Sequence, residues 1–219
     1  VAFHNLHGGG AGRLSRLEDH LRQGAAGVVV LGGLTDEWSS LLRGADLGPY
    51  EVVRPSDADG PYRLAVLSRV PVEGAAEIDL GSEGRTSGIV VRTRIGGREV
   101  VVLGVRTRSP RDGVASLARD RELADVAAWA AAESDPTIVV GDLNVTPWSH
   151  SFRTLLRDGS LHDSSRGRGW QPTWPDRFGP LMIPIDHALL GEGLVAVGRR
   201  TGPSLGSEHR SVEVDVAVA

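Results

Sequence analysis

The sequence contains no cysteine and no lysine, and all 24 of its basic residues are arginine. Without cysteine the chain has no thiol nucleophile, disulfide or zinc finger. Without lysine it has no Schiff-base residue and no lysine of a Walker-type phosphate loop. The five tryptophans are too few and too scattered to form a platform on which nucleic-acid bases stack. No apolar run is long enough to cross a bilayer.

The 219 residues are enough to bury a substantial core, and they fall within the size of one domain. Hydrophobic residues make up 40% and charged residues 24%, as is ordinary for a globular protein. No repeat or linker divides the chain, so we predict a single domain over residues 1–219. The formal net charge of −4 gives no overall attraction to nucleic acid. A nucleic-acid partner is therefore unsupported, and we expect a monomer.

Apolar runs and amphipathic stretches alternate along the chain. Strands are predicted at residues 1–6, 28–31, 52–53, 64–67, 89–95, 99–105, 137–140, 188–190 and 212–218. Helices are predicted at residues 14–21, 36–42, 115–133 and 152–156, with a flexible turn at residues 8–10 and a loop over residues 158–184. Hairpins mixed with strand–helix alternation indicate an α/β fold of two packed sheets flanked by helices.

Three segments near the end of the chain carry polar groups that suit one site. They are Gly141-Asp142-Leu143-Asn144, Ile185-Asp186-His187 and Gly206-Ser207-Glu208-His209-Arg210. Together they supply three carboxylates, an amide and an imidazole, a set that suits a divalent cation and a phosphate ester. Asp142 and Asn144 lie two apart on backbone that we expect to be extended, so their side chains should share a face. That carboxylate could take a proton from water while the amide donates to a phosphoryl oxygen.

The same segments carry a family resemblance. The run VVGDLNVTPWS at residues 139–149 resembles the GDxN segment of the endonuclease/exonuclease/phosphatase superfamily, whose best-known fold is DNase I-like. The run IDHALL at residues 185–190 resembles the next motif, and residues 206–210 resemble the closing G-S-D-H segment. Secondary matches lie at residues 3–5, 67–71 and 172–175. The resemblance covers nearly the whole chain and implies a four-layer α-β-β-α sandwich, with two mixed or antiparallel sheets flanked by helices.

The resemblance implies catalytic roles for Asp142, Asn144, Asp186 and His209. Asp142 would activate or position the attacking water, and Asn144 would steady the phosphoryl group. Asp186 would pair with His209, fix its tautomer and favour its charged form, so that an imidazolium meets the anionic phosphate.

The resemblance also implies a metal site, and here the sequence departs from the family. Asn5 and Glu208 would hold Mg²⁺ or Mn²⁺, with Glu208 in place of the usual aspartate. Gly33, however, stands where the family has its principal metal-binding glutamate, and Arg106 stands where many relatives have a histidine. An arginine can bind phosphate but is a poor acid–base catalyst. A loss of about 4 kcal/mol of transition-state stabilisation would slow the reaction roughly a thousandfold.

Two hypotheses follow from this conflict. The first is a metal-dependent phosphoesterase, cleaving a phosphodiester or phosphomonoester by attack of water at an altered metal site. The second is a catalytically silent protein that keeps the scaffold and a cleft for an anion or a partner. Retention of Asp142, Asn144, Asp186 and His209 favours the first, whereas Gly33 and Arg106 favour the second.

Four further residues are candidates for the cleft. Trp174 and His7 could line it, and Arg106 and Arg108 could either grip a phosphate or face solvent. The chain starts at Val1 and has no cysteine. Relatives with similar motifs include membrane-anchored and secreted bacterial proteins, so we expect an extracytoplasmic location.

Overall fold

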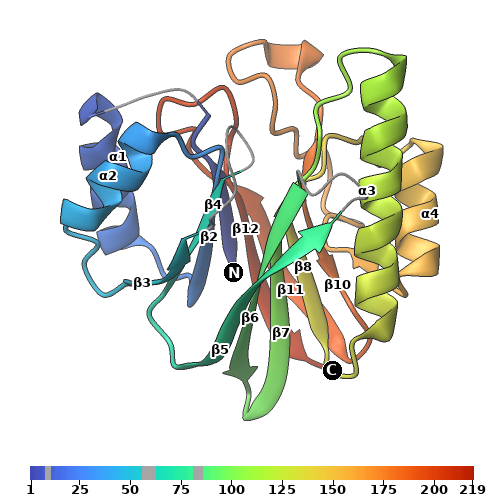
Figure 1. Cartoon of the computed structure of the whole chain (residues 1–219), viewed down its shortest axis with the longest axis horizontal. Coiled ribbons are helices and arrows are strands. Elements are labelled where there is room, and N and C mark those ends of the chain that lie inside the picture. The colour runs from blue at the N-terminus through green and yellow to red at the C-terminus, as the bar shows by residue number, and fades with distance from the viewer. Residues whose placement is uncertain (8–10, 56–62, 81–85) are drawn as a thin grey trace.

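A computed structural model of the chain describes residues 1–7, 11–55, 63–80 and 86–219. Strands in the described residues form two sheets of six, and helices lie outside them (Figure 1). In chain order the elements are β1 (Ala2–Asn5), α1 (Ala11–Gln23), β2 (Val28–Gly32), α2 (Asp36–Gly44), β3 (Glu51–Pro55), β4 (Leu64–Ser68), β5 (Val72–Leu80), β6 (Thr86–Ile95), β7 (Arg98–Arg106), α3 (Gly113–Ala132), β8 (Thr137–Asp142), α4 (His150–Asp158), β9 (His162–Asp163), η2 (Gly179–Leu181), β10 (Asp186–Leu190), β11 (Leu194–Thr201) and β12 (Val212–Val218).

Both sheets are mixed. The first runs β11-β12-β1-β2-β4-β3 and the second runs β5-β6-β7-β8-β10-β9. β1 is parallel to β2 and β7 is parallel to β8, while the other described pairs are antiparallel. Helices α1 and α2 cover the outer face of the first sheet, and α3 and α4 cover the second (Figure 1). The predicted four-layer α-β-β-α sandwich is confirmed.

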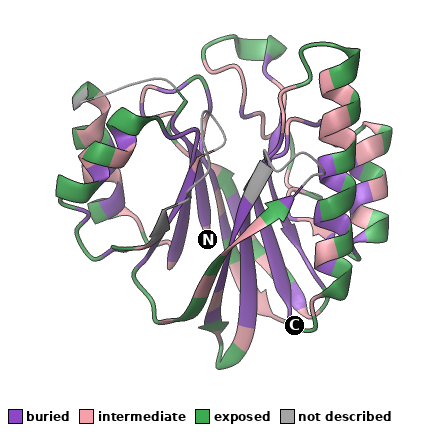
Figure 2. Ribbon diagram, viewed as in Figure 1, coloured by how far each residue is buried: buried purple, intermediate pink, exposed green. Residues whose placement is uncertain are grey.

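Apolar side chains fill three interfaces between these four layers. Phe3, Val30 and Val140 belong to the cluster between the two sheets, which holds them together face to face. Leu17 and Trp38 belong to the cluster under α1 and α2, and a third cluster lies under α3 and α4. Figure 2 shows the buried residues concentrated on the strands and on the inward faces of the helices. Because both faces of each sheet are covered, the central strands read as continuous apolar runs.

Side-chain caps fix where three helices begin. Thr35 Oγ1 accepts from the Trp38 N–H at 3.3 Å, Asp112 Oδ1 from Ala115 at 2.8 Å, and Ser149 Oγ from Phe152 at 3.1 Å. Each cap satisfies a backbone N–H that the helix itself leaves without an acceptor. The caps of α3 and α4 therefore also fix the ends of the loops that follow β7 and β8.

Three strands were not predicted from the sequence, and each of them is an edge strand. β5, β9 and β11 lie at sheet edges, at residues where no strand was predicted. β5 reads VEGAAEIDL and is half-buried or exposed along most of its length, while β9 has only two residues and lies within the predicted loop 158–184. An edge strand has one neighbour and a partly solvated face, so it needs no apolar run.

The turn predicted at residues 8–10 lies outside the described residues. No described helix is long and apolar enough to span a membrane.

His4 is an ionisable group buried between β1 and α1. It is 3% exposed, its ring meets the edge of the His20 ring at 4.9 Å between centroids, and Glu213 on β12 is the neighbouring anion. Burial, followed by repulsion from His20, lowers the pKa of His4 from 6.5 to about 3, although Glu213 acts in the opposite direction. The folded protein therefore holds a neutral imidazole here at any pH near neutrality.

We predict that this buried imidazole makes folding sensitive to acid. Below pH 6.5 the unfolded chain takes up a proton at His4 that the folded chain excludes, because the folded pKa is about 3. The free energy of unfolding should fall by up to about 1.4 kcal/mol per pH unit between these two values. Urea unfolding at pH 6, 5 and 4 should give a shallower decline for His4→Leu than for the native chain. An exposed control, His150→Gln, should keep the native decline, and parallel curves for native and His4→Leu would contradict the prediction.

Candidate active site

The topology brings several strand ends to one place. β1, β7 and β8 end at Asn5, Arg106 and Asp142, and β10 begins at Asp186. Asp142 is the Cα partner of Arg106 on one side and of Asp186 on the other, so all three side chains project from the same face of the sheet. His209 lies three residues before β12, whose first residue pairs with β1 near Asn5. Residues far apart along the chain therefore meet at one end of the sandwich.

Gly141 sets the spacing between β7 and β8 beneath this site. A Cβ atom built on Gly141 would lie 1.7 Å from the carbonyl oxygen of Val105 and 2.8 Å from its carbonyl carbon. These are backbone atoms of the neighbouring strand, so they could not move aside without moving the strand. The absence of a side chain at residue 141 thus allows Arg106 and Asp142 to stand next to each other.

Asp142 is the centre of the polar network. Asn5 Nδ2 donates to Asp142 Oδ2 at 2.9 Å, Arg106 Nε donates to the same oxygen at 3.4 Å, and the Asn144 N–H donates to Oδ1 at 3.1 Å. Burial, followed by repulsion from Asp186, raises the pKa of Asp142 from 3.8 to about 6. His209, Arg106 and the Asn144 N–H act in the opposite direction. Asp142 is therefore an unusually basic carboxylate that is still mostly ionised at neutral pH.

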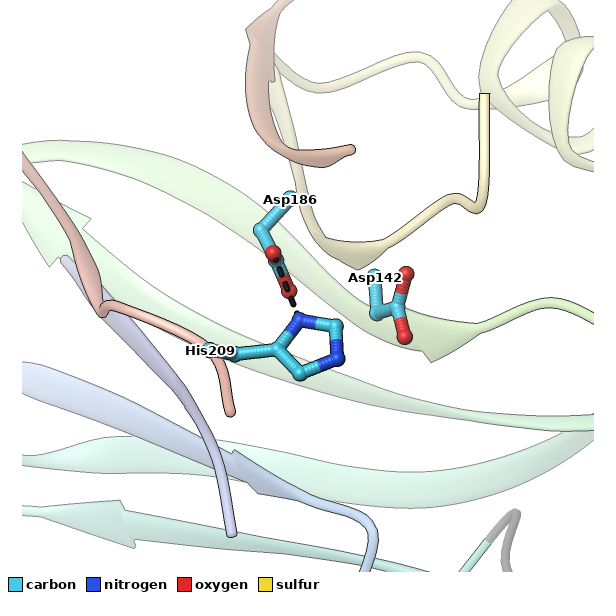
Figure 3. A group of neighbouring side chains, drawn as sticks. All are labelled: Asp142, Asp186 and His209. Atoms are coloured by element: carbon cyan, nitrogen blue, oxygen red, sulfur yellow. Dashed lines mark hydrogen bonds and ion pairs between the residues drawn. The ribbon is translucent and has the colours of Figure 1, made fainter. Parts of the chain in front are cut away.

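Asp186 and His209 form a buried pair. His209 Nδ1 lies 2.9 Å from Asp186 Oδ2, and Figure 3 shows the imidazole between the two carboxylates with its second nitrogen on the side of Asp142. Thr173 Oγ1 accepts the backbone N–H of Asp186 at 3.1 Å, and Ser207 Oγ accepts that of His209 at 3.1 Å. A proton on Nδ1 is donated to Asp186 Oδ2 and leaves Nε2 as the ring nitrogen available to a ligand.

Two opposing effects act on the pKa of His209. Burial alone would lower this pKa, but attraction and a hydrogen bond from Asp186, together with attraction from Asp142, raise it above 6.5. Arg106 acts against the charge, and the net direction is upward. The imidazolium form is thereby favoured although the His209 side chain is largely buried.

Asn144 lies beside Asp142, but not for the reason that the sequence suggested. β8 ends at Asp142, and Asn144 has a φ of 47°, in the left-handed region rather than the extended one. Its Nδ2 donates to the carbonyl of Thr107 at 2.9 Å, so this amide ties the β8 loop to the β7 loop. The expectation of an extended backbone and of a shared face with Asp142 is wrong, because Asp142 accepts the Asn144 N–H and turns the chain.

These groups line a cleft of about 870 Å³. All the predicted site residues except Asn5 and Asp186 are on its surface, and those two lie directly beneath it in contact with Asp142 and His209. Glu208 is exposed at the cleft, where Trp174 and His7 also lie. Several residues that line the cleft or support it were not predicted from the sequence, namely Thr107, Arg111, Arg119 and Thr173. Thr173 could have been found from its Pro172-Thr173-Trp174-Pro175 segment, whereas the arginines carry no local signal.

Comparison with known proteins decides the family. The model of the endonuclease/exonuclease/phosphatase family matches residues 2–209. The chain belongs to this family. Among curated proteins, no sequence match was found.

Solved structures of endonuclease/exonuclease/phosphatase proteins share the fold at low identity. A protein of this family from Beutenbergia cavernae is 21% identical with a TM-score of 0.78, covering 100% of this chain and 71% of that one. Zebrafish (D. rerio) TDP2 complexed with a single-strand DNA product is 16% identical with a TM-score of 0.75, covering 94% and 92%. Sphingomyelinase C from Streptomyces griseocarneus is 19% identical with a TM-score of 0.65, covering 100% and 98%.

Members of the endonuclease/exonuclease/phosphatase family usually use a divalent cation, and part of a donor set is present here. Asp142, Asp186 and His209 each offer one ligand atom within 4.8 Å of the others. The charges of these carboxylates are already compensated, however, because Arg106 contacts Asp142 and His209 contacts Asp186. A divalent ion on Asp142 Oδ2 would have to displace the guanidinium.

Residue 33, where the family resemblance implies a metal-binding glutamate, suits a cation no better. Gly33 offers no side-chain oxygen, and Asn5 Oδ1 accepts the His7 N–H at 3.2 Å. Asp36, close in sequence, is exposed and pairs with Arg63 instead of reaching the cleft. Glu208, the other residue predicted to hold the metal, is exposed at the cleft. The residues present therefore do not fit the family's cation at its usual place.

The backbone around Gly33 leaves no room for a side chain at this residue. Its φ is +69°, and a Cβ atom there would lie 2.6 Å from Asn5 Oδ1 and 3.1 Å from the His7 nitrogen. The backbone of this chain has closed over the space that a side chain at residue 33 would need. An added carboxylate at residue 33 would meet both a left-handed backbone and a filled space.

We predict that Gly33→Ala destabilises the protein more than a matched glycine does. Gly97→Ala is the control, because Gly97 has a φ of +83° and no atom of the described residues lies within 4 Å of a Cβ there. The left-handed backbone should cost about 1–2 kcal/mol at either residue. Overpacking against Asn5 and His7 should add about 1 kcal/mol or more at Gly33. Urea unfolding measures both values, and equal losses would show that the space beside Gly33 is open.

We also predict that the raised pKa of His209 depends on Asp186. In Asp186→Asn the burial of His209 persists while its main anionic partner is gone, so the pKa of His209 should fall below 6.5. Titration of the imidazole nitrogens by NMR measures this pKa directly. The exposed Asp158→Asn should leave it raised. A His209 pKa that stays raised in Asp186→Asn would mean that another group holds the charge.

Proposed function

We propose that this protein hydrolyses phosphate esters by attack of water on phosphorus, at an active site altered from that of its family. One observation carries the proposal: the buried Asp186–His209 pair and the basic Asp142 carboxylate meet at the floor of one cleft. Such a constellation offers a proton acceptor and a proton donor to the same bound group.

Asp142 is the proposed base. With a pKa near 6 it is mostly ionised at neutral pH, yet more basic than an ordinary carboxylate. It would accept a proton from water as the water oxygen bonds to phosphorus. Asn5 and the Asn144 N–H hold the two carboxylate oxygens in place, so the base is oriented before a substrate arrives.

His209 is the proposed acid. As the bond from phosphorus to the leaving oxygen breaks, the imidazolium would give its Nε2 proton to that oxygen, and Asp186 would keep the ring oriented through Nδ1. The proton that Asp142 gains and the one that His209 loses balance the reaction. Arg106 would contact the phosphoryl oxygens, on which negative charge develops.

The relatives support the reaction class without naming the substrate. The zebrafish TDP2 structure holds a single-strand DNA product, and another relative is a sphingomyelinase C. The net charge of −4 gives this chain no overall attraction to nucleic acid. The expectation of Mg²⁺ or Mn²⁺ came from the family resemblance and is not part of the proposed reaction, whereas the monomeric state and the extracytoplasmic location stay predictions. No step of the proposed reaction passes through a metal ion.

A second candidate function is an anion-binding protein without turnover. It is favoured by Gly33, which leaves the family's metal ligand missing, and by the pairing of Arg106 with Asp142. Such a protein would bind a phosphate group in the same cleft and release it unchanged.

Hydrolysis of bis-p-nitrophenyl phosphate and p-nitrophenyl phosphate tests the proposal. We expect slow turnover by the native chain, and a loss of about 10²–10⁴-fold in His209→Ala, because the general acid is removed. The exposed His150→Ala, outside the cleft, is the matched control and should keep the native rate. Each assay is run with Mg²⁺, with Mn²⁺ and with EDTA, so that the cation dependence is measured as well.

The outcomes separate the two candidate functions. Turnover that survives in His150→Ala and disappears in His209→Ala supports the hydrolase. No turnover under any condition, together with saturable binding of inorganic phosphate, supports the anion-binding protein. Turnover that is equal in native and His209→Ala would remove the site assignment itself.

A further inference from the structure

We propose that the Arg106 guanidinium is the built-in cation of this site, so that the cleft binds a phosphate group without a divalent metal ion. This inference rests on the proposed function in one respect, namely that the ligand of the cleft is a phosphate ester. It concerns how the anion is held and not whether it is cleaved.

The position of Arg106 suits this role. It is the last residue of β7, its side chain is 10% exposed, and it lines the cleft beside His209 and Asn144. Its Nε lies 3.4 Å from Asp142 Oδ2, the same oxygen that Asn5 contacts. A guanidinium carries five N–H groups in one plane, so it can bridge a carboxylate and a phosphate, as a metal ion would.

Charge balance favours one arginine over an added divalent ion. The two buried carboxylates, Asp142 and Asp186, face two cationic groups, Arg106 and the imidazolium of His209. A further charge of +2 within a few ångströms of a guanidinium would be repelled strongly in a partly dry pocket. An arriving phosphate, by contrast, meets N–H donors that are already oriented and needs no ion to be bound first.

The change at Gly33 is physically linked to Arg106. The space beside Gly33 is filled by Asn5, Asn5 donates to Asp142, and Asp142 accepts from Arg106. The four residues therefore form one continuous chain of contacts across both sheets. The metal-binding carboxylate is absent at one end of this chain, and a permanent cation is present at the other.

Other arginines strengthen the attraction for anions at the cleft. Arg108, Arg111 and Arg119 also line it, and Arg111 is exposed near the end of the loop into α3. Arg108 contacts Glu122 and Arg119 contacts Asp120, so part of this charge is balanced locally. Arg106 differs from them because it contacts the proposed base directly.

Calorimetric titration with inorganic phosphate tests the proposal. We expect the native chain to bind phosphate with the same affinity in EDTA and in Mg²⁺. Arg106→Gln should weaken binding by about tenfold to a hundredfold, because it loses a charge-assisted contact. Arg106→Lys should lie between the two, since it keeps the charge and loses the planar fork. The matched control is Arg157→Gln, an exposed arginine on α4 outside the cleft, which should bind like the native chain.

A second measurement keeps the proposal testable if a variant at residue 106 does not fold, which thermal unfolding would reveal. Titration of the native chain with Mn²⁺ should give no saturable heat in EDTA-free buffer. Phosphate binding that appears only with Mg²⁺ or Mn²⁺ would overturn the proposal, as would native affinity in Arg106→Gln or no phosphate binding by the native chain. Binding that is insensitive to EDTA in a chain without turnover supports this inference and refutes the hydrolase. Turnover and phosphate binding that both require the metal would refute this inference and support a hydrolase.

Discussion

The hydrogen bond from Asn5 to Asp142 joins the two sheets at the end of the sandwich, and the geometry of the cleft depends on it. Asn5 ends β1 in the first sheet and Asp142 ends β8 in the second. The cores between the layers bring the sheets together but, being apolar, do not fix how two particular side chains meet. A directed contact of 2.9 Å between buried polar groups does fix this. Leaving either partner unpaired would carry the penalty of a buried polar group.

Asp142 has a second constraint, because its charge is buried beside another carboxylate. A buried anion persists only where neighbours compensate it, and here compensation comes from a guanidinium and an imidazolium. Burial and repulsion from Asp186 outweigh these cationic neighbours, so the carboxylate is more basic than usual. The electrostatics that hold the site together are thus the ones that suit it to proton transfer.

Much of the fold could be predicted from the sequence because its central strands are buried on both faces. Runs such as residues 28–31 and 137–140 can hardly be anything but interior strands, and Pro136 marks where α3 must have ended. The edge strands β5, β9 and β11 escaped because a half-solvated strand can carry glycine and charged residues. Turn chemistry also escaped: Asp142 accepts the backbone N–H two residues on, an Asx turn that the expectation of an extended backbone at Asn144 overlooked.

Part of the candidate site could likewise be predicted from the sequence, and part of it could not. The grouping of Asp142, Asp186 and His209 followed from motif order, because strand ends in this topology must meet. The pairing of Arg106 with Asp142 could not be predicted, since it requires the register between β7 and β8. Nor could the closure over Gly33, where a missing side chain in the sequence turns out to be a rearranged backbone.

Gly141 shows how the backbone beneath the cleft controls the position of the side chains above it. Its hydrogen stands where any side chain would collide with the carbonyl of Val105, so the distance between two neighbouring strands is set by an atom that meets no ligand. The relative position of Asp142 and the Arg106 guanidinium is thus set by the spacing of the two backbones. A buried residue that touches no substrate can thus control the geometry of the groups above it.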